Sequence, residues 1–160
     1  MSHAEANTNS DAFLRQRRFG RECALQFLYQ VDQRQDWEIA DGDLNAFWRQ
    51  VEDQEDAPFG NDLNRARKFA EKIVRIFREH GAEIDESLQE CASNWTLERM
   101  AAIDRNILRV AAVEIRFLEN IPANATINEA VEIAKRYGDR DSAAFINGIL
   151  DRFAQNSSQA

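Results

Sequence analysis

Metal ligands and catalytic motifs are scarce in this sequence of 160 residues. It has two cysteines, Cys23 and Cys91, and two histidines, His3 and His80, which cannot form a recognisable zinc-binding spacing. Each cysteine falls in a predicted helix, where we expect it to pack as a small hydrophobic residue. The glycine-rich and nucleophile motifs of nucleotide-binding proteins, hydrolases and zinc proteases are also missing. We therefore expect no cofactor, no metal and no enzymatic activity.

Long apolar runs are missing as well. No stretch approaches the roughly 18 apolar residues that span a bilayer, and the polar residues 1–10 lack the apolar region of a signal peptide. The hydrophobic fraction of 44% is enough for a packed core, while 30% charged residues indicate a soluble surface. These features predict a cytoplasmic protein that does not enter a membrane. We expect the polar ends, residues 1–10 and 156–160, to be disordered.

Apolar residues recur at helical spacing along the chain, and we find no convincing strand and no internal repeat. Residues 102–119 are apolar on most of the helix circumference, so other elements must surround this helix. Its clearly charged strip is narrow and consists of Arg105, Arg109 and Arg116. We predict one all-α domain, residues 1–160, with about seven helices in two packed bundles around this central helix.

The two bundles are predicted at about residues 11–80 and 83–155. His80-Gly81 is predicted to end the last helix of the first bundle, because glycine commonly follows a helix C-terminus. Trp95 lies in the following linker, and we expect it to fill the core between the bundles.

The net charge of −8 argues against nucleic-acid binding until the charges are located. Residues 36–62 contain nine acidic side chains and one arginine, so the rest of the chain is nearly neutral. Residues 15–21 contain no acidic side chain and four arginines, namely Arg15, Arg17, Arg18 and Arg21. The protein is therefore electrically polarised, and its overall charge is a poor guide to its partners.

The basic residues 15–21 lie in a helix predicted from about Asp11 to Gln33. On a helical wheel Arg18, Leu25 and Tyr29 share one direction, away from the apolar stripe, and Arg21 and Arg15 lie about 60° to either side. Outward arginines can pair with phosphates, and a tyrosine ring can stack on a base, as single-stranded RNA requires. The alternative is an ordinary solvated basic face. Gly20 weakens this helix, so its basic turns are expected to order fully only on binding.

A second cluster of cations and aromatic rings lies near the C-terminus. Lys135, Arg136 and Arg140 flank Tyr137, and Phe145 follows at the edge of the apolar stripe of the last helix. Cations interleaved with rings suit unstacked RNA bases and their phosphates. The alternative is a helix-capping turn whose rings pack into the core.

Three stretches together resemble the NusB family of bacterial transcription antitermination factors: residues 17–29, 104–114 and 127–151. The resemblance implies an all-helical, non-enzymatic protein of two helical bundles. It also implies that the protein binds the boxA element of ribosomal RNA leader transcripts together with NusE, a small-subunit ribosomal protein. The complex then helps RNA polymerase to read through terminators.

The resemblance also implies roles for individual residues. The family's RNA-contacting positions correspond to Arg17, Arg18, Arg21, Tyr29, Tyr137, Asp141 and Phe145. With the neighbouring cations Arg15, Lys135, Arg136 and Arg140, they form the predicted RNA-binding set. Glu98 and Asp104 match acidic positions at the family's interface with NusE and RNA. Some family members self-associate, which leaves monomer or homodimer open. The alternative functions are a protein–protein adaptor and a noncatalytic RNA-docking module of ribosomal RNA processing or modification.

Overall fold

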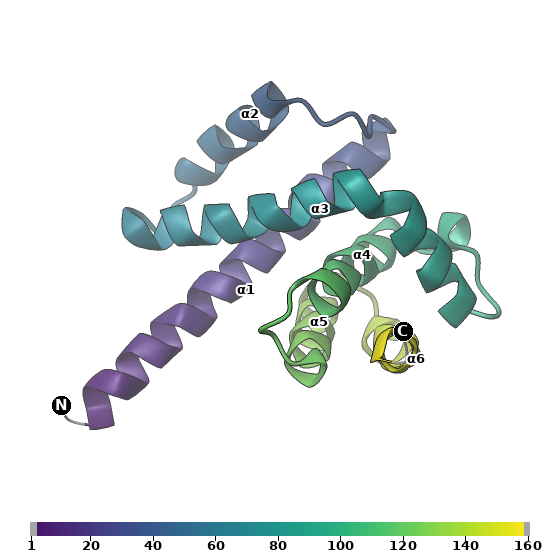
Figure 1. Ribbon diagram of the computed structural model, residues 1–160. Helices are drawn as coiled ribbons and strands as arrows, with labels where there is room; N and C mark the ends of the chain where they lie inside the picture. Colours follow the sequence, from purple (N-terminus) through teal and green to yellow (C-terminus); the bar gives the residue numbers. More distant parts are fainter. Residues whose placement is uncertain (1–2, 159–160) are drawn as a thin grey trace.

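The computed structural model describes residues 3–158, with side chains from 11 to 157, and this part of the chain is helical without a strand. In chain order the elements are α1 (His3–Arg34), α2 (Asp41–Glu52), α3 (Asn61–Cys91), the 3-10 turn η1 (Leu97–Arg99), α4 (Ala102–Phe117), α5 (Ala123–Tyr137) and α6 (Ser142–Ser158) (Figure 1). The predicted all-α fold of about seven helices is therefore confirmed.

The central helix of the fold is α4, as predicted. It contacts α1, α3, α5 and α6, and every residue from Asn106 to Glu114 is buried. A helix that is apolar on most of its circumference cannot leave a face to solvent, and here each face meets a different neighbour.

The long helix α3 differs from the prediction, because no break occurs at His80-Gly81. The apolar stripe continues in phase through Phe77, Ile84 and Leu88, which are separated by seven and four residues and are all buried. Packing of this stripe outweighs the cost of about 1 kcal/mol for a glycine inside a helix. The predicted boundary between the two bundles thus falls inside α3, which changes direction along its length (Figure 1).

The terminal helices are longer than predicted. The first begins at His3 rather than near Asp11, and α6 continues to Ser158, beyond the predicted start of the polar tail at residue 156. Residues 1–2 and 159–160 lie outside the described residues. The N-terminal turns of α1 extend past the other helices (Figure 1).

The placement of Trp95 was predicted wrongly. Its ring is 55% exposed and packs edge-to-face on Phe145, with ring centroids 6.3 Å apart. The continuous α3 brings the helices together directly, so no separate side chain is needed to fill a gap between two bundles.

Two flanks of α1 are covered, by α3 on one side and by α4 on the other. Gly20 is buried at the crossing with α3, where an added Cβ would lie 2.9 Å from Cδ1 of Phe69 and 3.0 Å from the carbonyl oxygen of Ala66. The glycine that seemed to weaken this helix therefore permits a close helix crossing.

Candidate nucleic-acid interface

The structure brings the two predicted RNA-binding segments together. Arg18 of α1 donates from Nε to Glu129 of α5, 2.9 Å from Oε2. In the opposite direction, Arg136 at the end of α5 pairs with Glu22 of α1. The hydroxyl of Tyr137 lies 3.5 Å from the same Glu22 carboxylate. We call this surface the α1–α5 face.

Most cations of the α1–α5 face already have a carboxylate partner. Besides the two pairs between helices, Lys135 lies 3.2 Å from Glu132 one turn earlier. Their cationic side chains are 54–62% exposed, so a phosphate can reach them, but the Glu22 and Glu129 side chains are only 16% exposed. Replacing either of these two carboxylates by a phosphate therefore leaves a largely covered charge without its partner, which limits the net gain. Arg15 and Arg140 are exposed and have no hydrogen bond or ion pair with any residue from 11 to 157.

Arg21 does not face outward, and this part of the prediction is wrong. It is 6% exposed, and its Nη2 lies 2.8 Å from Oε1 of Glu114 in α4. Arg21 projects about 60° away from Arg18 on the helical wheel. Because neighbouring helices cover two flanks of α1, this offset is enough to place Arg21 against α4. Burial raises the pKa of Glu114, and the hydrogen bond and charge of Arg21 oppose that shift. Leu25, also predicted on the outer face, is buried for the same reason.

The aromatic residues of the predicted set are only partly accessible. Tyr137 is 40% exposed, whereas Tyr29 and Phe145 are half-buried. Phe145 lies against Trp95, so an RNA base could reach it only beside that indole ring. Asp141 is exposed just before α6, where its amide donates to Oδ1 of Asp139.

The two acidic residues predicted to bind a partner lie in different environments. Glu98 is exposed on η1. Asp104 is 7% exposed in the first turn of α4, and its Oδ1 makes no hydrogen bond within the described residues. Burial raises the pKa of Asp104, a hydrogen bond with Ser142 opposes the shift, and the negative charge of Asp139 adds to it. Direct contact with a partner is open to Glu98, whereas the carboxylate of Asp104 faces the interior.

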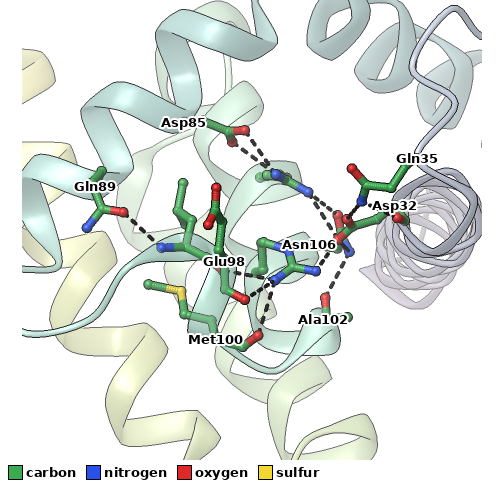
Figure 2. A network of polar contacts seen from close by, with 11 residues as sticks. Asp32, Gln35, Asp85, Gln89, Glu98, Met100, Ala102 and Asn106 are labelled. Atoms are coloured by element: carbon green, nitrogen blue, oxygen red, sulfur yellow. Dashed lines mark hydrogen bonds and ion pairs between the residues drawn. The ribbon is translucent and has the colours of Figure 1, made fainter.

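A polar network that the sequence did not reveal holds η1 in place (Figure 2). Asp32, near the end of α1, accepts hydrogen bonds from Arg105 at 2.8 Å and from Asn106 at 2.9 Å. Arg109 lies 3.3 Å from Asp32 and makes two hydrogen bonds of 2.9 Å to Asp85 of α3. Because Asp32 is almost fully buried, these donors compensate for the loss of water around its charge.

The same network reaches the turn that carries Glu98. Arg105 donates from Nη1 to the carbonyl oxygens of Leu97 at 2.9 Å and Met100 at 3.2 Å, and Gln89 accepts from the amide of Leu97 at 2.8 Å. An open pocket of about 630 Å³ lies beside η1, with Glu98 among its lining residues. Arg105 of the charged strip on the central helix therefore positions this turn, while Arg109 shares Asp32 with it and joins α4 to α3. Only the narrowness of that strip on an otherwise apolar helix pointed to such a role.

Metal binding finds no support in the described part of the chain. No group of three or more histidine, cysteine, aspartate or glutamate side chains there is placed to hold a metal ion. Both cysteines are unpaired and buried, and burial raises the pKa of Cys23 to about 12. None of the described helices is both long and apolar enough to cross a membrane.

Comparisons with known proteins show the family to which this fold belongs. The model of the NusB family matches residues 19–155. The chain is 44% identical over 138 residues to the transcription antitermination protein NusB of Geobacter sulfurreducens, which covers 86% of this chain and 93% of that protein. The protein of the same name from Trichlorobacter lovleyi is 45% identical over 135 residues, or 84% of this chain and 87% of the relative.

Solved structures give the same result. NusB of T. maritima superposes with a TM-score of 0.72 at 34% identity, covering 87% of this chain and 90% of that chain. A chain from a crystal structure of the antitermination factors NusB and NusE in complex with dsRNA gives a TM-score of 0.72 at 26% identity, covering 89% of this chain and 98% of that one. The chain therefore belongs to the NusB family.

Proposed function

We propose that this protein is an RNA-binding transcription antitermination factor. It binds boxA-type single-stranded RNA of ribosomal RNA leader transcripts together with NusE, and the complex promotes read-through of terminators by RNA polymerase. The observation that carries the proposal is the pairing of Arg18 with Glu129 and of Arg136 with Glu22, which joins both predicted RNA-binding segments into one surface. The names of its relatives support the antitermination role, and the complex of a structural neighbour with NusE and dsRNA supports RNA binding together with NusE.

On the α1–α5 face, RNA phosphates compete with Glu22 and Glu129 for the arginines. Each phosphate that replaces a carboxylate keeps the guanidinium paired, while the released carboxylate, which is only 16% exposed, loses its partner. The net gain per contact is small, and the net charge of −8 opposes the approach of RNA. The protein alone is therefore expected to bind weakly. A NusE surface that completes the site raises the affinity through effective concentration.

The test is a fluorescence-anisotropy titration of a boxA-type RNA and a scrambled RNA, each with and without NusE. We expect tighter binding of the boxA-type RNA, and a further gain with NusE. Tyr29→Ala removes a stacking ring, which is worth about 1–3 kcal/mol per base, so it should weaken binding about five- to hundredfold. Equal affinity for both RNAs in the presence of NusE would contradict the proposal. A large fall in the melting temperature of Tyr29→Ala would instead assign this ring to the core.

A second candidate function is that of a protein–protein adaptor, in which RNA contact is incidental. Two observations favour it: most cations of the α1–α5 face are already paired, and the exposed Glu98 lies beside an open pocket. The adaptor predicts that Arg18→Glu leaves terminator read-through intact while Glu98→Lys abolishes it. The RNA-binding factor predicts a loss with Arg18→Glu.

A further inference from the structure

A second basic groove lies on the other flank of α1, against α3. It has a volume of about 420 Å³, and its lining includes the cations Arg17, Arg65, Lys68 and Lys72 and the rings of Phe13 and Phe69. Among residues 11–157 the remaining lining residue is Gln16, and no acidic residue in that range contributes to the wall. We call this cavity the α1–α3 groove.

The cations of the α1–α3 groove differ from those of the α1–α5 face because they lack carboxylate partners. Arg65, Lys68 and Lys72 are exposed and make no hydrogen bond or ion pair with any residue from 11 to 157. They occur at i, i+3 and i+7, so they project from one side of α3. At the edge of the groove, Gln16 donates to Asp62 at 2.7 Å.

Arg17 lies between the two rings of the groove. Its guanidinium carbon is 4.9 Å from the centroid of Phe13 and 4.0 Å from that of Phe69. Burial, and then repulsion from Arg21, lower the pKa of Arg17, and the negative charge of Glu114 partly opposes this shift. The ring of Phe13 remains 52% exposed. The groove therefore offers a cluster of uncompensated positive charge next to an accessible aromatic surface.

We propose that the α1–α3 groove is a second binding surface for single-stranded RNA, which holds the strand beyond the segment bound on the α1–α5 face. Unpaired cations attract the phosphates, and the exposed Phe13 ring offers a plane on which a base can stack. Arg17 and Arg18 project about 100° apart from consecutive positions of α1. A helix with its side chains is only about 10–12 Å across, so one strand can pass around α1 from one surface to the other.

This proposal rests on the proposed RNA-binding function, and RNA length separates the two. The probes are a boxA-type RNA of about 6 nucleotides, enough for one surface, and one of about 20 nucleotides that can reach both. The variant Lys68→Ala/Lys72→Ala should bind the long RNA about tenfold more weakly than the unmodified protein. Its plot of log affinity against log salt concentration should be shallower by about 1.4, which corresponds to two lost phosphate contacts. Binding of the short RNA should stay unchanged.

Arg65→Ala and Arg49→Ala provide a matched pair of single substitutions. Both remove an exposed arginine from a helix. Arg49, however, belongs to α2, which packs on another side of α3, as the hydrogen bond from Arg67 to Asn45 shows. Only Arg65→Ala should weaken binding of the long RNA, and circular dichroism verifies that both variants are folded. An unchanged affinity and salt dependence for the long RNA in the Lys68→Ala/Lys72→Ala variant would overturn the proposal. The groove would then be assigned to an acidic protein segment instead of RNA. Failure of the unmodified protein to bind the short RNA, even with NusE, would instead contradict the α1–α5 face.

Discussion

Arg21 of α1 and Glu114 of α4 form a buried ion pair in which Nε and Nη2 of the arginine lie 2.8–2.9 Å from the carboxylate oxygens. Both side chains are almost inaccessible to water. The pair therefore joins the basic helix to the central helix. An arginine in the middle of a basic segment serves the fold rather than the surface.

Loss of Arg21 should destabilise the protein strongly. Arg21→Met leaves the Glu114 charge buried without a partner, which costs about 3–5 kcal/mol in the free energy of unfolding. Arg18→Met, which breaks an exposed pair, should cost less than about 1 kcal/mol. Urea denaturation of both variants measures the difference. The double variant Arg21→Met/Glu114→Leu should recover most of the stability, and a double variant as unstable as Arg21→Met would contradict this assignment.

Gly20→Ala should destabilise the protein although alanine favours helices. The added methyl group would lie 2.9 Å from Cδ1 of Phe69, so α1 and α3 must move apart, at a cost of about 1–3 kcal/mol. Gly148→Ala in α6 is the matched control, because its added Cβ meets no atom within 4 Å. That control should stabilise the protein by up to about 1 kcal/mol. Thermal denaturation of the two variants should give melting temperatures shifted in opposite directions.

Glu129→Gln should tighten RNA binding. The substitution removes the carboxylate that pairs with Arg18, so this arginine becomes available to a phosphate without competition. In the unmodified protein the displaced carboxylate takes up a salt cation that offsets one released from the RNA, so its removal makes the plot of log affinity against log salt concentration steeper by about 0.7. Glu119→Gln makes the same change at an exposed position without a partner among residues 11–157, so it controls for net charge. Equal gains in affinity from both substitutions would show that only overall charge matters.

Asp104→Asn should stabilise the protein at neutral pH. Burial raises the pKa of Asp104, so the folded chain binds more protons than the unfolded chain around and above the usual pKa of aspartate. Under that condition the free energy of unfolding falls as the pH rises through the window, and an asparagine removes this dependence. Denaturation at pH 7 and at about pH 3.5 should therefore show a gain at the higher pH and almost none at the lower. The exposed Asp141→Asn is the control, and a gain that does not depend on pH would contradict the explanation.

The sequence predicted correctly those helices whose side chains meet the same kind of surroundings on most sides. The central helix was identified because its apolar residues cover most of its circumference, which permits only a surrounded position. The two segments of cations and aromatic rings were also identified. Their meeting through Arg18 and Glu129 depends on how α1 and α5 pack, which no local pattern contains.

The errors concern residues whose environment is set by more than one neighbour. A helical wheel that assumes one buried side places Arg21 on the solvent-exposed side of the helix. In the structure, α1 is covered on two flanks, so Arg21 is buried. His80-Gly81 resembles a helix end, but the apolar stripe of α3 continues in phase beyond it. The α1–α3 groove was missed although the spacing of Arg65, Lys68 and Lys72 already places three cations on one side of α3. The approach of Arg17 and Phe13 from α1 depends on how the two helices pack, and no local pattern contains it.

The unbroken course of α3 has a consequence for proteolysis. Because one helix belongs to both groups of helices, no loop separates them at residues 80–83, where the sequence predicted a boundary. A protease that cuts there would release halves that each expose apolar residues normally covered by the other.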